Sequence, residues 1–382
     1  MSKTLSQPYT YYEFFSGGGM VRAALSPEWK CLFANDNDPK KAKSYINNWG
    51  SSELVVKNIQ ELHVSELPGK VDLAWASFPC QDLSLAGYGA GLSGNRSGTY
   101  WYFYDLMKSL KGENRNPKII VLENVLGAIT SHSGKDFTSI LKSLVELGYY
   151  IGPVVIDAKL FVPQSRKRLF VVAIQDFLVE SGRILSRLPL ERWHPKSLQE
   201  VYKVQDSEVM SRWLWLDLPV PPKRDKDLKD IISINFSGND WDNEEKTKHY
   251  LDLMTDINLK KVKIMKNLGK TIVGGLYRRT RNGLQRAEVR FDGVAGCLRT
   301  PAGGSSRQTI IAVYDNQVMT RLLTAREAAR LMGLPEDYQL PDNYNDAYYL
   351  IGDGVVVPVV RFLEEQIFEL ILLDEKSHAK IA

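Results

Sequence analysis

The sequence predicts an α/β fold in which a Rossmann-like, doubly wound parallel sheet is followed by a second, smaller and irregular domain. Three observations carry this prediction. Short apolar strands alternate with helical patterns through the first half of the chain, the alternation dissolves after about residue 175, and regular structure returns near residue 323. Strand–helix alternation is typical of a parallel sheet buried between two layers of helices.

Seven short runs rich in Val, Ile, Phe and Tyr are the expected strands. They occupy residues 11–15, 30–35, 53–56, 71–77, 118–125, 150–157 and 168–174. Helical patterns lie between several of them, at residues 39–49, 100–110 and 135–148. Near the end of the chain, Thr324 and Glu327 match a capping box ahead of an amphipathic helix. A last helix, at about 359–373, has the apolar content to pack back onto the first domain.

These changes of pattern divide the chain into four parts. The first domain is expected at 1–178, the irregular domain at 179–319, a hinge with the capped helix at 320–347, and a return to the first domain at 348–382. The irregular domain holds four of the eight tryptophans, a proline-rich patch and an acidic stretch, followed by a basic segment.

Composition excludes several classes of protein. With 44% hydrophobic and 25% charged residues among 382, the chain is typical of a globular protein with ample core. No apolar stretch approaches the roughly 18 residues of a membrane span, and the N-terminus lacks the apolar region of a signal peptide. Cys31, Cys80 and Cys297 are too few and too scattered for a disulfide framework or a zinc site. We therefore expect a cytoplasmic protein without a structural metal.

The positive charge is concentrated in one segment. Residues 260–310 hold 12 Lys and Arg against two acidic residues, although the net charge of the whole chain is only +4. Such a segment on an otherwise acidic chain is the footprint of a polyanion-binding protein. A solvated charged surface is the simpler alternative, but interleaved Gly, Arg and aromatic residues favour contact with a ligand.

A glycine-rich turn, FFSGGGM, follows the first expected strand. Glycines there allow the backbone to approach a ligand at the carboxyl end of a parallel sheet. The turn is not GxGxxG and no Walker lysine follows it, so a dinucleotide or ATP is poorly supported. The second strand ends in NDND, where Asp36 is well placed to bind a ribose. Together the two motifs indicate a nucleoside-containing cofactor.

Three further motifs follow other strands of the same domain. SFPCQDLS places Cys80 in a turn just past an apolar run, ENV places Glu123 at a strand end, and QSRKR lies in the next loop. Strand ends of one parallel sheet can present Cys80 and Glu123 to a single cleft. A surface loop or a satisfied polar group would explain each motif alone, but not their common order.

With these motifs the chain resembles the cytosine-5 DNA methyltransferases of restriction–modification systems, nearly from end to end. FSGGGM resembles the family's cofactor loop, NDND its ribose-binding strand end and SFPCQDLS its nucleophile loop. ENV, QSRKR, LTAREAARLMGLPEDY and YYLIGDGVVVPVV match in the family's order. The resemblance implies a methyltransferase sheet and a target-recognition domain.

The resemblance also implies S-adenosylmethionine as methyl donor. Phe15 is expected against its adenine, Asp36 on its ribose, and Asn58 with Ile59 near the adenine edge. The full set implied for this cofactor site is Phe15, Ser16, Gly17, Gly18, Gly19, Met20, Asp36, Asn37, Asn58, Ile59, Pro79, Tyr100, Asp353, Gly354 and Val355.

Cytosine C5 is too weak a nucleophile to take a methyl group directly, whereas addition of a thiolate to C6 makes an enamine that reacts at C5. Cys80 is the expected nucleophile, with positive charge from Arg166 or Arg168 favouring its thiolate. By resemblance, Glu123 contacts the N3 edge of the base and Gln81 shapes the nucleophile loop.

The substrate implied is double-stranded DNA from which the target cytosine is flipped out. RRTRNGLQR and LRTPAGGSSRQ are the expected contact loops, with the side chains of Arg278, Arg279, Arg281, Arg286, Arg299 and Arg307. Two positions depart from the family's pattern: Asp353 replaces an Asn after Gly352, and Cys297 replaces a Thr before Leu298. We expect Cys297 to be a small packing residue.

Two alternatives remain open from the sequence. A tRNA cytosine-5 methyltransferase would share the fold, but the long segment between the two halves of the catalytic domain favours duplex DNA. A catalytically silent DNA-binding relative would be expected to lack Cys80, Glu123 or the arginines, and all are present. The chain is expected to act as a monomer, and a cognate restriction endonuclease would be a separate protein.

Overall fold

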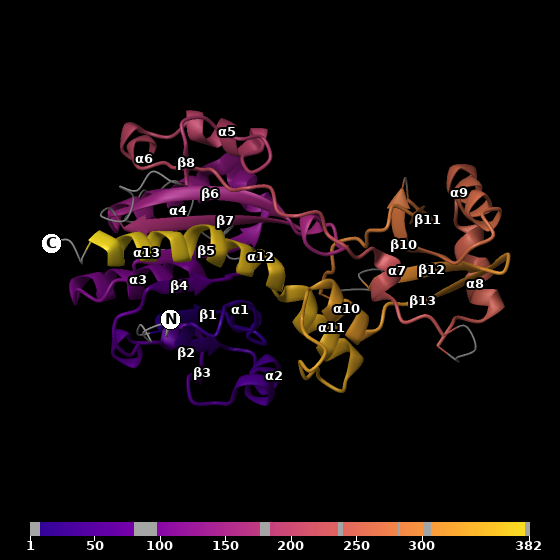
Figure 1. Cartoon of the computed structure of the whole chain (residues 1–382), viewed down its shortest axis with the longest axis horizontal. Helices are drawn as coiled ribbons and strands as arrows, with labels where there is room; N and C mark the ends of the chain where they lie inside the picture. The colour runs from indigo at the N-terminus through magenta and orange to yellow at the C-terminus, as the bar shows by residue number, and fades with distance from the viewer. Residues whose placement is uncertain are drawn as a thin grey trace, which may run out of the picture. The chain divides into compact units, whose positions relative to one another are not determined.

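The computed structural model describes residues 8–79, 98–175, 184–235, 240–281, 283–300 and 307–378 (Figure 1). The chain forms two compact units. Unit 1 comprises Met1–Ile156, Lys167–Val220 and Val359–Ala382, and unit 2 comprises Asp157–Arg166 and Pro221–Pro358. Residues 179–220, expected in the irregular domain, belong to unit 1. Residues 157–166 and 348–358, expected in the first domain, belong to unit 2. The expected domain boundaries differ from this division at all three places.

Unit 1 is built on a seven-stranded sheet whose strand order is β3-β2-β1-β4-β5-β7-β6. Its strands are β1 Tyr9–Phe14, β2 Trp29–Asp36, β3 Leu54–Val56, β4 Leu73–Ala76, β5 Ile119–Val125, β6 Tyr149–Asp157 and β7 Lys167–Gln175. All seven coincide with the apolar runs in the sequence. Strands β3, β2, β1, β4 and β5 pair in parallel, so their carboxyl ends form one edge.

The parallel prediction was wrong for β7, which pairs antiparallel with β5. Only residues 158–166 connect β6 to β7, and this segment is too short for the crossover connection that would make β7 parallel to β6. The amino end of β7 consequently lies at the carboxyl edge of β5, with Arg168 opposite Val125. The sheet is therefore mixed.

Helices cover both faces of the sheet, as expected for a doubly wound fold. They are α1 Met20–Ala24, α2 Pro39–Trp49, α3 Thr99–Gly112, α4 Lys135–Glu146, α5 Lys196–Lys203, α6 Ser207–Ser211, α12 Val357–Leu363 and α13 Glu369–His378. Tyr12 and Phe14 face a core shared with α3 and α4. On the other face, the Trp29 ring contacts Phe368 and the Ser26 N–H donates to Glu364, both from the C-terminal helical segment. The expected return of that segment to the first domain is confirmed.

The second domain is more regular than the sequence suggested. Unit 2 contains an antiparallel sheet in the order β11-β10-β12-β13, formed by β10 Ile272–Arg281, β11 Leu284–Arg290, β12 Thr309–Tyr314 and β13 Gln317–Leu322. Its helices are α7 Leu228–Ile231, α8 Glu244–Asp252, α9 Asp256–Lys266, α10 Ala325–Leu331 and α11 Tyr344–Asp353. A small strand pair, β8 Leu185–Ser186 and β9 Trp215–Leu216, belongs to unit 1.

The capped helix forms as predicted. Thr324 and Glu327 complete the capping box of α10, and Glu327 also accepts two hydrogen bonds from the buried Arg321, at 2.7 and 2.8 Å. Within the described ranges, no helix combines the length and apolar character of a membrane span.

Candidate functional site

The glycine-rich turn closes onto the end of the neighbouring strand. The Ser16 N–H donates to the carbonyl of Asn35 at 2.9 Å, and the Gly17 N–H donates to Asp36 Oδ2 at 2.8 Å. A Cβ built on Gly17 would meet only the Lys41 side chain, at 4.0 Å, so the turn is open on that side. The carboxyl edge of β1 and β2 therefore offers backbone and space to a ligand.

Two features of this turn fit a bound nucleoside. Phe15 has a positive φ of 57°, which is strained for an aromatic residue and typical of functional loops. Ser16 Oγ is buried and has no hydrogen-bond partner among the described residues. An unpartnered buried hydroxyl beside open space is the kind of group that a ligand satisfies.

The third glycine of the turn has a packing reason. At Gly19, a Cβ would lie 2.5 Å from Trp49 Nε1, and this indole N–H donates to the Gly18 carbonyl at 3.0 Å. Helix α2, which ends at Trp49, thus holds the turn from behind, while Met20 begins α1 and is buried.

Asp36 is the charged group of this part of the site. Burial raises the pKa of its carboxyl, while the Lys41 charge and the N–H groups of Asp38 and Gly17 act in the opposite direction. Asp38 donates to Oδ1 at 2.9 Å. Since each carboxylate oxygen accepts more than one hydrogen bond, Asp36 can hold the turn and still bind a hydroxyl.

The other residues expected near the cofactor fall into two groups. Asn37 is exposed beyond β2, and Asn58 caps a short 3₁₀ turn, Ile59–Glu61, that follows β3. Ile59 and Tyr100 are buried in the core. The Tyr100 hydroxyl is hydrogen bonded to Ser143 at 2.6 Å, so Tyr100 contributes to the packing of the core.

The segment that leads to the expected nucleophile is anchored at its start. Asn124 donates from Nδ2 to the Phe78 carbonyl at 3.1 Å, and the Phe78 ring packs on Tyr100. Pro79 follows as an exposed residue. Cys80 and Gln81 lie outside the described residues, so their expected roles remain predictions.

Glu123 and Arg168 meet at the same edge of the sheet. Arg168 Nε lies 3.0 Å from Glu123 Oε1, with only 15% and 9% of the two side chains exposed. The contact arises because β7 runs antiparallel to β5, so that the start of β7 faces the end of β5. The edge that holds Asp36 thus also holds a carboxylate fixed by a guanidinium.

Comparison with known proteins shows the family of the chain. Residues 9–369 match the sequence profile described as C-5 cytosine-specific DNA methylase. The chain belongs to the C-5 cytosine-specific DNA methylase family. It is accordingly a DNA cytosine-5-methyltransferase of restriction–modification type, with S-adenosylmethionine as methyl donor.

Relatives match over nearly the whole chain. The type II methyltransferase M.HpaII of Haemophilus parainfluenzae is 27% identical over 382 aligned positions, covering 96% of this chain and 90% of the relative. M.MspI of Moraxella sp is 26% identical over 367, covering 95% and 71%. Among solved structures, Entamoeba histolytica methyltransferase EhMeth has a TM-score of 0.59 at 16% identity, covering 96% of this chain and 99% of that one. Dnmt2 of S. pombe has 0.57 at 18%, covering 95% and 99%; both likenesses show the fold.

Arg166 has a structural role that the sequence did not predict. It is only 2% exposed, and its guanidinium donates to the carbonyls of Leu298 at 2.7 Å, Gly352 at 3.0 Å and Gly354 at 2.7 Å. All three lie in unit 2, as does Arg166 itself. Arg166 therefore links the segment at Leu298 to the segment at 352–354. The spacing of the two arginines in QSRKR did not predict this link.

The C-terminal motif of the methylase lies in unit 2. Asp353 ends α11 and is exposed, Gly354 caps the helix, and Val355 is buried. Gly352 packs so closely that a Cβ there would lie 2.7 Å from the backbone of Arg299. Glycine is therefore required at this position by packing.

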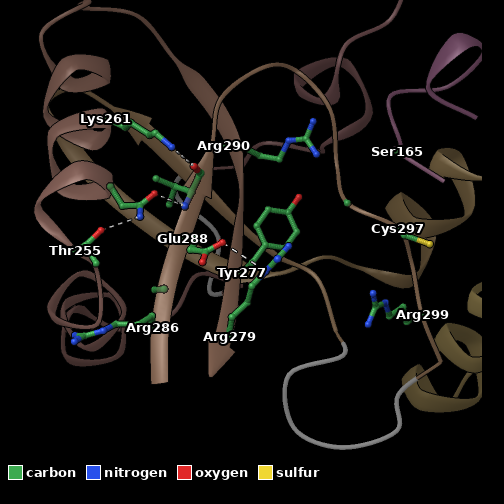
Figure 2. A pocket seen from close by; sticks show the side chains of 14 residues that line it. Ser165, Thr255, Lys261, Tyr277, Arg279, Arg286, Glu288, Arg290, Cys297 and Arg299 are labelled. Atoms are coloured by element: carbon green, nitrogen blue, oxygen red, sulfur yellow. Dashed lines mark hydrogen bonds and ion pairs between the residues drawn. The ribbon is translucent and has the colours of Figure 1, made fainter. Parts of the chain in front are cut away.

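Unit 2 also contains a cavity of about 590 Å³ lined by basic residues (Figure 2). Three of the six expected DNA-contact arginines line it: Arg279, Arg286 and Arg299. Cys297 also lines it, half-buried and with its sulfur 3.6 Å from Arg166, in agreement with a packing role.

The other three arginines lie elsewhere in unit 2. Arg278 projects from the opposite face of β10, with its guanidinium 6.0 Å from the centre of the Tyr250 ring. Arg307 is hydrogen bonded to Asn345 and lies over Tyr344. Arg281 ends β10. Arg278 and Arg279 therefore lie on different faces of β10, because successive residues of a strand face opposite sides.

Several positioning residues were not predicted from the sequence. Asn124 was part of ENV and Gln164 part of QSRKR, but neither received a role. Gln164 is fully buried, donates to the Leu331 carbonyl at 2.8 Å and accepts from the Leu298 N–H at 3.0 Å. The sequence signal that could have identified them is a side-chain amide close to the charged residue of each motif. In the cavity, Glu288 and Tyr277 were also missed, although the period of two along β10 and β11 would have placed them beside Arg279.

Proposed function

We propose that this methyltransferase acts on a flipped-out cytosine within a specific double-stranded DNA sequence, through a covalent bond between Cys80 and cytosine C6. The observation that carries this proposal is the Glu123–Arg168 pair, fixed at the carboxyl edge beside the segment that leads into Cys80. A carboxylate held in one orientation is what recognition of a base edge requires.

The residues divide the chemistry among them. The Cys80 thiolate adds to C6 while the Glu123 carboxylic acid, oriented by Arg168, donates its proton to N3, so that the negative charge developing on the ring is neutralised. S-adenosylmethionine supplies the methyl group that C5 takes up. A water molecule then takes the C5 proton as the Cys80 thiolate leaves, and N3 returns its proton to Glu123, which restores the aromatic ring and frees Cys80.

The cofactor is proposed to bind at the turn between β1 and α1. Asp36 would accept hydrogen bonds from the ribose, the Ser16 hydroxyl would gain a partner, and the strained Phe15 would meet the adenine. The remaining cofactor residues are proposed on the resemblance alone: Gly18, Met20, Asn37, Asn58, Ile59, Pro79, Tyr100, Asp353, Gly354 and Val355.

Unit 2 is proposed to grip the DNA. Its cavity gathers cations that can position phosphates, and the chemistry requires the base to leave the helix before Cys80 can reach it. We propose a cytoplasmic monomer, with any cognate endonuclease as a separate protein.

The test is transfer of labelled methyl groups from S-adenosylmethionine to plasmid DNA and to tRNA, with wild type beside Cys80→Ser. Bisulfite sequencing of the DNA product then locates the modified cytosines. A short recurrent context methylated by the wild type and not by the variant is the expected result.

Other outcomes would overturn parts of the proposal. Label on tRNA alone would make the chain an RNA methyltransferase. Methylation by Cys80→Ser at the wild-type rate would exclude Cys80 as the nucleophile, and DNA binding without transfer to either substrate would indicate a silent relative.

A further inference from the structure

The β10–β11 hairpin has one apolar and one charged face. Leu276, Ala287 and Val289 belong to the core of unit 2 together with Ile311. The alternate residues are Tyr277, Arg279, Arg286, Glu288 and Arg290, and all five line the cavity. Since residues paired directly across antiparallel strands share a face, these side chains form one surface.

Like charges stand opposite each other on this charged face. Arg279 pairs with Arg286 across the two strands. Such a pair destabilises an isolated sheet, so its presence indicates a ligand that supplies acceptor groups. Arg286 and Arg299 form no ion pair with a described residue, whereas Arg290 binds Asp292 and Lys261 donates to the Val289 carbonyl.

One carboxylate stands among these cations. Glu288 Oε2 lies 3.5 Å from Arg279 Nε, and Figure 2 shows the two joined across the strands. A carboxylate repels phosphates and would weaken a surface that bound only the DNA backbone. It becomes favourable where the ligand offers a hydrogen-bond donor, and in the major groove such donors are the amino groups of cytosine N4 and adenine N6.

The floor of the cavity is rigid. A Cβ built on Gly275 would lie 2.6 Å from the Tyr277 hydroxyl, and one on Gly296 would lie 2.7 Å from the Tyr277 ring. The edge of β11 is held by Asn258 of α9, whose Oδ1 accepts from the Val289 N–H at 3.1 Å. Arg279 and Glu288 thus project from a fixed support, as discrimination between bases requires.

We propose that Glu288 and Arg279 together read one C·G pair that flanks the target cytosine in the recognised sequence, an assignment that rests on the proposed action on specific duplex DNA. Glu288 accepts from cytosine N4 while Arg279 donates to guanine O6 and N7, which lie beside N4 in the major groove. A two-stranded ribbon fits that groove. Arg286 and Arg299 bind phosphates.

A C·G pair fits better than an A·T pair. With adenine on Glu288, Arg279 would meet only the O4 of thymine and could not form the bidentate contact that guanine allows. With guanine or thymine on Glu288, the carboxylate would face only acceptor atoms of the base. Glu288 and Arg279 would then lack matching hydrogen-bond partners in the complex.

The experiment compares base-pair discrimination by wild type, Glu288→Ala, Glu288→Gln and Arg279→Ala. Once bisulfite sequencing has defined the wild-type site, duplexes with each flanking base pair replaced in turn are assayed for kcat/KM. Glu245→Gln, at an exposed position of α8, is the matched control for loss of a carboxylate. Thermal melting verifies that each variant is folded.

We expect wild type to lose about 5- to 150-fold in kcat/KM when one particular C·G pair is replaced. Glu288→Ala and Arg279→Ala remove this penalty at that pair alone, and Glu288→Gln shifts preference there toward A·T because glutamine binds adenine N6 and N7. The control keeps the wild-type profile.

The proposal is overturned if the folded variants retain wild-type discrimination at every position, if their losses are uniform across positions, or if the recognised site has no flanking C·G pair. Should either Glu288 variant fail to fold, Arg279→Ala reports on the same base pair. Absence of DNA methylation by wild type would instead refute the proposed function, so the two failures are distinguishable.

Discussion

Arg168 Nε lies 3.0 Å from Glu123 Oε1, although the two residues belong to strands that run in opposite directions. The antiparallel register brings the start of one strand beside the end of the other, at the edge where the parallel strands β1, β2 and β4 also end. The pair places a carboxylate of fixed orientation beside the segment that enters the nucleophile loop.

Removing the guanidinium should impair the chemical step more than DNA binding. We expect Arg168→Ala to lower kcat by about 100-fold, because a misplacement of the order of 1 Å can cost that factor. A double-mutant cycle with Glu123→Ala checks the cause: if Arg168 acts through Glu123, the combined loss is much smaller than the product of the single losses. Lys167→Ala, exposed on the neighbouring residue, should keep wild-type kcat.

Asp36→Asn should weaken cofactor binding. Both carboxylate oxygens accept backbone N–H groups, from Gly17 and Asp38, so an amide would direct its NH₂ against one of them. We expect KM for S-adenosylmethionine to rise at least tenfold, in line with roughly 1–3 kcal/mol for an unsatisfied buried group. Calorimetric titration with the cofactor gives an independent measure, and unchanged affinity would show that this turn does not hold it.

Arg166→Met should destabilise unit 2. The substitution leaves the carbonyls of Leu298, Gly352 and Gly354 without their donor, and we expect a loss of roughly 3 kcal/mol or more in the free energy of unfolding. Urea unfolding followed by tryptophan fluorescence measures it. Lys248→Met, at an ion pair with Asp252 in which both side chains are exposed, should change stability by less than about 1 kcal/mol. Intact stability with reduced kcat would return Arg166 to the catalytic role expected from the sequence.

Local patterns predicted much of the fold, and long-range contacts account for what they missed. Each strand of the seven-stranded sheet is an apolar run, and the order of motifs placed Glu123 and Arg168 in neighbouring segments. The burial of Arg166 depends on segments more than 100 positions away, which no local pattern encodes. The sheet of unit 2 was missed because its charged face obscured the alternation, although Asn282-Gly283 is a strong hairpin signal between β10 and β11.

Gly352→Ala should be costly for a steric reason. The added Cβ would lie 2.7 Å from the Arg299 carbonyl carbon and 2.8 Å from the Thr300 nitrogen, and backbone cannot yield as a flexible side chain can. We expect a loss of roughly 1–3 kcal/mol in the free energy of unfolding. Gly127→Ala, where no heavy atom lies within 4 Å, is the control and should be near neutral. Equal stabilities for the two variants would contradict the close packing of α11.

Glu13, buried in β1 behind the glycine-rich turn, should make stability depend on pH. Burial raises the pKa of its carboxyl from 4.5 to about 8, against the opposing effects of the Val21 N–H and the Arg22 charge. Between these two values the folded chain keeps a proton that the unfolded chain has released. The contribution of Glu13 is therefore fully present below about pH 4.5 and is lost as the pH rises toward 8.

Glu13→Gln removes this titration while keeping a similar shape. We expect the fall in unfolding free energy from pH 5 to pH 8, measured by urea denaturation, to be smaller in the variant than in wild type. Glu61→Gln, at an exposed position after β3, should leave the wild-type slope unchanged. If wild type and Glu13→Gln lose stability in parallel over this range, then the Glu13 carboxyl is ionised in the folded chain and its contacts with the start of α1 are those of a charged group.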